Sequence, residues 1–242
     1  MDIKEEAILG EHLARHWYYV SKGRAMRDLI RGVQTSEVLD VGAGSGVFSR
    51  QLLDAGVCKR ALCVDPHYAE ESDEIYAGGA IRFRHEAGPI NQGLILMMDV
   101  LEHVEDDLAL LRLYTDPMPI GAKLLISVPA FQFLWSEHDE FLEHFRRYKL
   151  AEVEQLVRNA GLRIGRSRYF FGALFPLIAA IRWGRGRTAR SANADSAPKS
   201  DLRPASPTVN TALTAIHDIE RKVMLPWNRT AGLTVFCLAE KT

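Results

Sequence analysis

The segment that most constrains how this chain folds is residues 37–46, Glu-Val-Leu-Asp-Val-Gly-Ala-Gly-Ser-Gly. A short apolar run leads through Asp40 into three glycines at alternate positions, and residues 47–53 then place apolar side chains at helical spacing. This order predicts a strand, a glycine-rich turn and a helix. Because glycine tolerates positive φ and carries no side chain, the backbone of such a turn can approach a nucleotide-like ligand at the helix N-terminus.

The glycine spacing separates two classes of nucleotide-binding turn. A nicotinamide-binding turn needs Gly-x-Gly-x-x-Gly, and counting from Gly42 puts Val47 at the third small-residue position. The order found here instead resembles the first motif of the class I methyltransferases, which bind S-adenosylmethionine (AdoMet). The resemblance implies a cofactor site that includes Asp40, Gly42, Ala43, Gly44 and Gly46.

A second acidic residue follows at the end of the next apolar run. Asp65 closes residues 60–65, and in nucleotide-binding α/β folds an acid at this strand end accepts hydrogen bonds from both ribose hydroxyls. Pro66, directly after it, belongs to the same expected cofactor site. Residues 80–84 are predicted as the third strand, and Glu86 is the nearby candidate for contacting the adenine amino group.

The string Asp-Val-Leu-Glu-His-Val at residues 99–104 resembles the class I methyltransferases more specifically than the glycine turn does. It follows residues 93–98, an apolar run typical of a strand buried on both faces. The resemblance adds Met98, Asp99 and Val100 to the expected cofactor site. Residues 121–129, which end in Ser-Val-Pro, are predicted as the fifth strand.

These motifs together imply a Rossmann-like α/β fold. We expect a seven-stranded, mostly parallel sheet with helices on both faces and an antiparallel C-terminal strand, in a single domain of residues 1–242. Residues 1–32 are expected to form a helical cap, with helix over residues 5–32. This cap either packs on the sheet or brings Tyr19, Lys22 or Arg24 to the methionine carboxylate of the cofactor.

Residues 170–225 are predicted as an insertion between the last two strands, residues 162–169 and 232–240. The insertion begins with an apolar run, which four arginines follow: Arg182, Arg185, Arg187 and Arg190. Residues 188–207 have the composition of a disordered linker, and residues 209–225 return to a helical pattern. Two interpretations stay open for the apolar run: it covers the substrate pocket, or residues 169–190 contact an anionic membrane surface.

Residues 130–148 are expected to form the substrate loop, because ligands of open α/β sheets bind beyond the carboxyl ends of the strands. The stretch is similar to a Leu-Trp-Ser-x-His-Asp and His-x-Arg-Arg-Tyr segment in a bacterial branch of the same family. Those relatives usually carry glycine where this chain has Glu143 and threonine where it has Lys149. The glutamate predicts that no tight backbone turn forms at position 143.

A hydroxyl acceptor loses a proton when it is methylated, so a general base is useful there. His138 is the first candidate, with His103 and His144 as alternatives and Asp139 as a partner or proton acceptor. The unperturbed histidine pKa of about 6.5 suits the role, although each histidine can equally be structural. Arg147, with its neighbour Arg146, can either clamp an anionic substrate group or begin a solvated basic helix.

The primary expectation is a site without metal. In some quinone-pathway O-methyltransferases, however, an acid-x-x-Glu-His cluster at this place binds a divalent ion, and Asp99, Glu102 and His103 match that cluster.

The expected function is AdoMet-dependent methyl transfer by in-line displacement, which mainly requires positioning because the sulfonium methyl group is already activated. The expected acceptor is a small molecule, a sugar or a lipid-linked compound, with oxygen as the preferred atom. The rival interpretation is a non-catalytic AdoMet-binding or scaffolding protein.

Composition limits the partners and the location of this protein. The formal net charge of −1 argues against a nucleic-acid partner. The acidic opening of the chain is unlike a signal peptide, and the three cysteines make no paired framework. We therefore expect a cytoplasmic protein, either free or peripheral at the inner membrane face.

Overall fold

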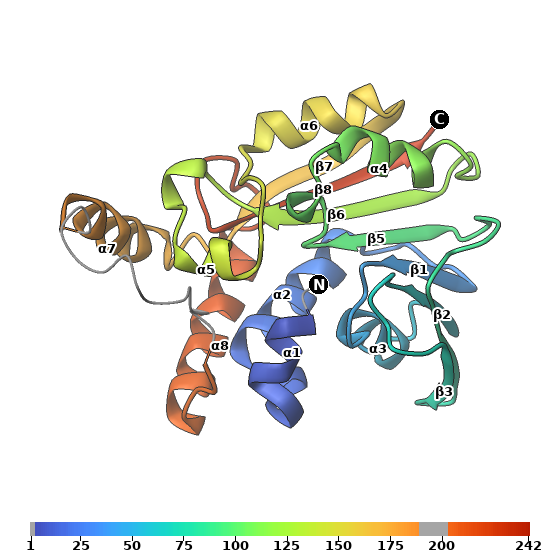
Figure 1. Ribbon diagram of the computed structural model, residues 1–242, viewed down its shortest axis with the longest axis horizontal. Coiled ribbons are helices and arrows are strands. Elements are labelled where there is room, and N and C mark those ends of the chain that lie inside the picture. Colours follow the sequence, from blue (N-terminus) through green and yellow to red (C-terminus); the bar gives the residue numbers. More distant parts are fainter. Residues whose placement is uncertain (1–2, 189–202) are drawn as a thin grey trace.

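The most apolar strand of the chain lies at the centre of one twisted sheet. The computed structural model describes residues 3–188 and 203–242 (Figure 1). All residues of β5 (Leu94–Met98) are buried, and this strand pairs in parallel with β1 (Glu37–Val41) on one side and β6 (Lys123–Pro129) on the other. Burial on both faces explains its unbroken apolar sequence.

The other strands extend the sheet to the order β3-β4-β2-β1-β5-β6-β8-β7. They are β2 (Arg60–Val64), β3 (Ser72–Tyr76), β4 (Gly79–Arg84), β7 (Leu162–Phe170) and β8 (Thr234–Lys241). β8 runs antiparallel between β6 and β7. The predicted Rossmann-like α/β fold with an antiparallel C-terminal strand is therefore confirmed.

The sheet has eight strands rather than the seven expected, because β3 forms before residues 80–84 in a segment where no strand was predicted. β3 pairs antiparallel with β4 through a tight turn at Ala77 and Gly78, whose φ angles of 50° and 76° suit a two-residue hairpin. β3 lies at the sheet edge and is half-exposed or exposed throughout. It therefore lacks the apolar alternation that identifies a strand in a sequence.

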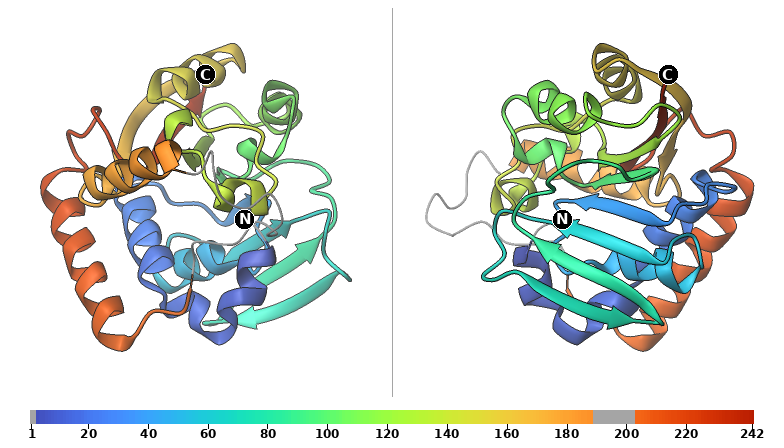
Figure 2. Two further views of the ribbon diagram at one scale, coloured as in Figure 1. Left: turned by 60° about the vertical axis from the view of Figure 1, so that its left-hand side comes forward. Right: turned by 90° about the vertical axis from the view of Figure 1, so that its right-hand side faces the viewer.

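Helices cover both faces of the sheet, as expected. They are α1 (Ile3–Leu9), α2 (Trp17–Leu29), α3 (Val47–Asp54), α4 (Asp107–Thr115), α5 (Glu137–Phe141), α6 (Leu150–Asn159), α7 (Phe175–Thr188) and α8 (Pro207–Val223), with short 3-10 helices η1 (Gly10–Arg15), η2 (Leu101–His103) and η3 (Gln132–Leu134). In Figures 1 and 2, α2, α3 and α8 lie on one face and α4 and α6 on the other. Alternate strand residues fill the two resulting cores, Val38 on the α3 side and Leu39 on the α6 side.

The N-terminal region is helical but is not one continuous helix. η1 begins directly after α1 at Gly10, whose φ of 50° interrupts the α-helix, and the extended His16 separates η1 from α2. α2 then packs against α3 and α8. The cap predicted over residues 1–32 therefore consists of short segments, and both of its proposed roles must be judged from individual side chains.

The insertion between β7 and β8 contributes α7 and α8. Ser206 caps the N-terminus of α8 by accepting a hydrogen bond from the Val209 backbone amide, and Pro207 occupies the first turn. Of the linker predicted over residues 188–207, residues 189–202 lie outside the described residues. In the described part of the chain, no helix combines the length and the apolar character needed to cross a membrane.

Candidate active site

The glycine turn joins β1 to α3 at the carboxyl ends of the parallel strands. Its three glycines all have positive φ, 64° at Gly42, 50° at Gly44 and 72° at Gly46, a region that L side chains rarely adopt. A Cβ atom on Gly46 would also lie 3.1 Å from Phe83 Cε1. The predicted strand, turn and helix are thus present, and the backbone conformation explains the alternating glycines.

A cavity of about 560 Å³ opens beside this turn, and we call it the glycine-turn cavity. Its lining includes five of the residues predicted for the cofactor site, which are Gly42, Asp65, Pro66, Asp99 and Val100. Glu86, the candidate for the adenine contact, is not among the described residues that line this cavity.

Asp65 is buried at the end of β2, and its carboxylate faces the turn. It accepts hydrogen bonds from the Gly44 amide at 3.3 Å and from the His67 amide at 3.0 Å. These bonds fix the orientation of the carboxylate beside the cavity. The position agrees with the predicted ribose acceptor, whose role stays a prediction.

The other predicted cofactor residues near the turn lie behind the cavity wall. Ala43 and Met98 are buried in the core on the α3 face, and Gly44 and Gly46 shape the turn. Asp40 is buried under α3, where it accepts a hydrogen bond from Ser49 Oγ at 2.8 Å, and burial raises the pKa of its carboxyl to about 6. None of these five residues is among the described residues that line the glycine-turn cavity.

The two cofactor residues predicted on α2 point elsewhere. Tyr19 donates a hydrogen bond to Glu5 Oε2 at 2.6 Å inside the core, and Arg24 pairs with Asp218 on α8. In the described structure, neither residue lines the cavities of this site. Lys22 instead reaches the site from α2, because its ammonium donates to the Asp99 carboxylate and to the Tyr18 hydroxyl.

Asp99 lies at the centre of the site and has an uncommon backbone conformation. Its φ is 58°, which is unfavourable for a non-glycine residue and is typical of functional positions. Ser127 Oγ donates to its carboxylate at 3.2 Å, in addition to the ion pair with Lys22. Burial favours the neutral acid, yet the Lys22 ammonium holds the pKa of Asp99 below its usual value. Asp99 is therefore an ionised, fixed acceptor.

A second cavity of about 260 Å³ lies across Asp99, and we call it the histidine cavity. Three of the predicted catalytic residues line it: His103, His138 and His144. Trp17, Phe171, Leu174 and Ile178 form an apolar wall. Asp99, His103 and Leu142 line both cavities, so the two meet there.

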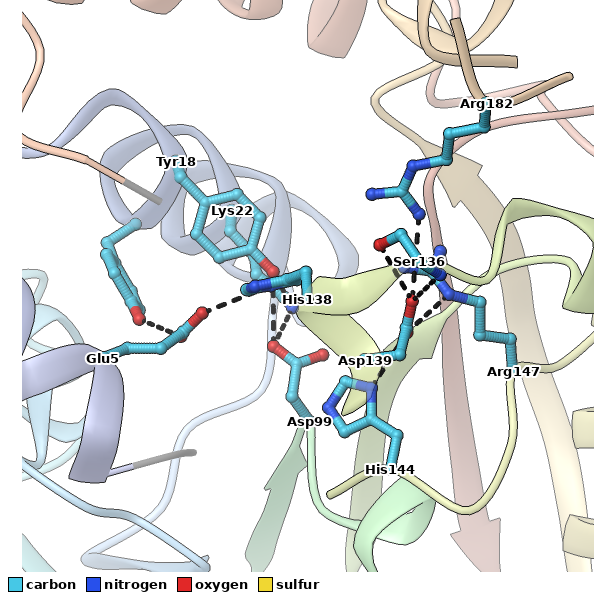
Figure 3. Close-up of polar contacts among 11 residues, drawn as sticks. Glu5, Tyr18, Lys22, Asp99, Ser136, His138, Asp139, His144, Arg147 and Arg182 are labelled. Carbon is cyan, nitrogen blue, oxygen red and sulfur yellow. Dashed lines mark hydrogen bonds and ion pairs between the residues drawn. The ribbon is translucent and has the colours of Figure 1, made fainter. Parts of the chain in front are cut away.

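Asp139, the fourth predicted catalytic residue, is buried beneath the histidine cavity and binds several neighbours (Figure 3). It accepts from His144 Nδ1 at 3.0 Å, from Arg147 Nε at 2.6 Å and from the Ser136 amide at 2.9 Å. Although burial opposes ionisation, these hydrogen bonds and the Arg147 charge lower the pKa of Asp139 well below its usual value. Asp139 thus positions other side chains.

Two side chains of η2 have strongly shifted acidities. Burial, and then the charge of Asp99, raise the pKa of Glu102 well above its usual value. Burial, and then the neighbouring His144, lower the pKa of His103 to about 3. His103 is therefore uncharged at neutral pH, and burial disfavours the ionised form of Glu102.

Several residues that line the two cavities were not predicted from the sequence. Arg182 of α7 was not among the predicted site residues, but it lines the histidine cavity and donates to the Leu134 carbonyl. Leu110 and Tyr114 line the glycine-turn cavity, and their spacing on one face of α4 was the available signal. The prediction that position 143 lacks a tight turn is wrong, because Glu143 has a φ of 59° and donates its amide to the Glu140 carbonyl.

Comparison with known proteins identifies the family of this chain. Residues 15–166 match the methyltransferase domain family. No curated protein gave a significant sequence match. An AdoMet-dependent methyltransferase from Archaeoglobus fulgidus is 15% identical with a TM-score of 0.55, and the alignment covers 98% of each chain.

Two further solved structures have a similar fold. Phosphoethanolamine N-methyltransferase 2 of Haemonchus contortus, in complex with AdoMet, is 12% identical with a TM-score of 0.54, covering 100% of this chain and 60% of that one. A Haloferax volcanii methyltransferase in complex with the Trm112 methyltransferase activator is 17% identical with a TM-score of 0.51, covering 93% and 96%. Since the family match spans more than half of the residues, this chain belongs to the methyltransferase domain family and is an S-adenosylmethionine-dependent methyltransferase.

Proposed function

We propose that this enzyme transfers the methyl group of AdoMet to a hydroxyl oxygen of a small, partly apolar acceptor or of the end group of a lipid-linked one. The observation that carries the proposal is the meeting of the two cavities at Asp99, His103 and Leu142. A donor in the glycine-turn cavity and an acceptor in the histidine cavity would face each other across these residues. In-line displacement requires such an arrangement.

The donor would lie along the glycine turn. The Gly42 backbone, Asp65, Pro66, Asp99 and Val100 would contact it, with Asp65 accepting hydrogen bonds from the ribose hydroxyls. When bound, AdoMet supplies a methyl group on a sulfonium. Asp40, Ala43, Gly44, Gly46 and Met98 would shape this site from behind, whereas Tyr19 and Arg24 have no part in it.

The acceptor would be amphipathic, because the walls of the histidine cavity differ in character. Trp17 and Phe171 contact each other edge to face at 5.8 Å between ring centroids, and Leu174 and Ile178 continue this apolar wall. Arg147 and Arg182 line the cavity with cationic side chains. An acceptor with an apolar body and a polar or anionic substituent would satisfy both kinds of surface.

His138 would act as the general base. It lines the histidine cavity, and its Nε2 lies 3.6 Å from Glu5 Oε1, which can orient the ring and stabilise the imidazolium that forms (Figure 3). The acceptor proton would pass to His138 as the oxygen attacks the methyl carbon. The electron pair of the breaking bond would remain on sulfur.

Methyl transfer can be measured with labelled AdoMet against matched alcohols, phenols, amines and thiols of partly apolar character. We expect label on oxygen acceptors, and we expect His138→Gln to lower kcat by about 100-fold because general bases contribute roughly that much. The exposed His12 supplies the matched control, His12→Gln, with kcat unchanged. Transfer only to nitrogen or sulfur would contradict the proposal. Tight AdoMet binding without turnover on any acceptor would favour the non-catalytic AdoMet-binding or scaffolding alternative.

The outer face of α7 motivates a second proposal, peripheral contact with a membrane surface. Ile178 and Arg182 of α7 line the histidine cavity, as does Leu174 just before the helix, so α7 covers the pocket. Leu177 and Ile181 on its outer side are 58% and 41% exposed. Such a contact would bring a lipid-linked acceptor to the cavity mouth.

Vesicle binding tests this contact. We expect flotation with anionic vesicles to fall at least about 10-fold in a Leu177→Ser and Ile181→Ser double variant, since burying each side chain is worth about 1.5–3 kcal/mol. Ile120, which is 84% exposed before β6, provides the control substitution Ile120→Ser. Equal flotation of all three proteins, or none for the wild type, would exclude the contact.

A further inference from the structure

Glu102 is the least explained side chain of the site. It is completely buried, and in the described part of the chain neither carboxylate oxygen has a hydrogen-bond partner. Buried polar atoms nearly always have such a partner, so this carboxylate needs a ligand or another explanation. Glu102 lines the histidine cavity, where a bound group can reach it.

Two histidines stand beside this carboxylate. One ligand atom each from Glu102, His103 and His144 lie within 4.8 Å of one another. The imidazole rings of His103 and His144 are nearly perpendicular, with centroids 4.6 Å apart. Metal bonds of about 2.1 Å place neighbouring ligand atoms about 3–3.5 Å apart, so side-chain adjustments of about 1 Å would complete a site.

The backbone holds these three residues together. The Phe145 amide donates to the Glu102 carbonyl at 2.7 Å, which fastens the segment carrying His144 to η2. The Tyr148 hydroxyl donates toward the Leu101 carbonyl at 3.1 Å and the Asp107 carboxylate at 2.9 Å, so it anchors the same segment again. The cluster is therefore built on fixed elements.

His144 has the partner expected of a metal ligand. Its Nδ1 is 3.0 Å from Asp139 Oδ1, which selects the tautomer whose Nε2 carries the free electron pair. A carboxylate that holds the far nitrogen of a ligating histidine is a recurrent feature of metal sites. Asp139 is in turn fixed by Arg147 and Ser136.

We propose that Glu102, His103 and His144 bind one divalent transition-metal ion, such as Zn²⁺, at the wall of the histidine cavity. Two imidazoles and one carboxylate suit Zn²⁺ better than Mg²⁺, which prefers oxygen ligands. This set revises the expectation of a metal-free site. It also replaces Asp99 of the sequence-based alternative with His144, because Lys22 and Ser127 already engage the Asp99 carboxylate.

A role of this ion in catalysis would rest on the proposed methyl transfer. Binding of the ion does not depend on that proposal. Three protein ligands leave coordination positions open toward the cavity, as in catalytic zinc sites. A divalent ion there would supply Lewis acidity to an acceptor oxygen and favour its deprotonation. Acceptors with a hydroxyl able to coordinate a cation would then be preferred.

Zinc affinity of the full-length protein tests the site without AdoMet or acceptor present. Protein stripped by a chelator is titrated with Zn²⁺ in competition with a chromophoric chelator, and we expect one ion per chain. Glu102→Gln and His144→Ala should each lower the affinity at least about 100-fold, more than the loss of an outer-sphere partner would. His138→Ala, in the same loop but outside the cluster, should retain it.

Glu102→Gln also separates loss of zinc binding from loss of folding, because the amide has the same shape as the carboxyl group that it replaces. Its metal-free form should unfold close to the wild-type temperature. Absence of saturable binding at micromolar Zn²⁺, or wild-type affinity in both ligand variants, would overturn the proposal. Neither result would contradict the proposed methyl transfer, which is tested by the assay with labelled AdoMet.

Discussion

Asp139→Ala is expected to lower the free energy of unfolding by about 3–5 kcal/mol. The fully buried carboxylate accepts hydrogen bonds from His144, Arg147 and the Ser136 amide. Its removal leaves the Arg147 guanidinium, 7% exposed, without its closest anionic partner. A buried charge that loses its partner is among the most destabilising changes in proteins. Urea denaturation of the wild type and the variant measures the difference.

The pH dependence of this difference has a defined sign. Because the folded protein holds the pKa of Asp139 below its unfolded value of about 3.9, the carboxylate stabilises the fold fully above that pH. The contribution is lost as pH falls toward the folded pKa. The stability difference between wild type and variant should therefore be constant from pH 8 to about 5 and shrink below about pH 4.

Asp139→Asn is the matched control, since it keeps the shape and one acceptor oxygen but not the charge. Its loss should be smaller than that of Asp139→Ala and should depend little on pH. A loss under about 1 kcal/mol for Asp139→Ala would mean that Arg147 and His144 find other partners, against the positioning role assigned to Asp139.

Asp65→Ala should weaken binding of AdoMet and S-adenosylhomocysteine by roughly 30-fold to 1000-fold. The expected hydrogen bonds from two ribose hydroxyls to an ionised carboxylate are worth about 2–4 kcal/mol together, and each 1.4 kcal/mol is tenfold. Calorimetric titration with S-adenosylhomocysteine gives the dissociation constants. The affinity of Asp65→Asn, which keeps one acceptor oxygen, should lie between those of the wild type and Asp65→Ala.

A neighbouring acid provides the control for this measurement. Asp73 on β3 is 68% exposed and lies outside the lining of the glycine-turn cavity, so Asp73→Ala should leave the affinity unchanged. A change below about threefold for Asp65→Ala would remove the ribose role from Asp65. Circular dichroism of both variants would show whether the protein stays folded when the acceptor of the Gly44 and His67 amides is removed.

The elements that sequence could predict are those governed by local chemistry. The turn at Gly42, Gly44 and Gly46 follows from backbone conformations that other residues disfavour. The buried run of β5 and the acid at the end of β2 likewise have short-range signatures. These features predict a cofactor site beside the glycine turn, and the glycine-turn cavity opens at that place.

What the sequence could not predict depends on which way a helix faces. Tyr18 and Lys22, four residues apart on α2, share the face toward Asp99, while Tyr19 and Arg24 point to the core and to α8. Helical periodicity alone does not say which face meets the site. The inward position of Arg182 could not be predicted for the same reason, since nothing in the sequence distinguishes it from the arginines that follow it. The packing of α7 on η3 directs this side chain inward.

The backbone conformations of Asp99 and Glu143 could not be predicted from the sequence either. Asp99 and Glu143 both adopt positive φ without being glycine, which sequence patterns treat as unfavourable. Asp99 is held by Lys22 and Ser127, and Glu143 by the turn that follows α5. Tertiary contacts therefore override local preference at Asp99 and Glu143.

A crystal structure of the protein with bound S-adenosylhomocysteine tests the central claim, that donor and acceptor cavities meet at Asp99 and His103. We predict that the ribose hydroxyls donate to Asp65 and that the product sulfur lies at this junction, open to the histidine cavity. A product bound outside the glycine-turn cavity, or with its sulfur facing away from His138 and His144, would contradict the claim.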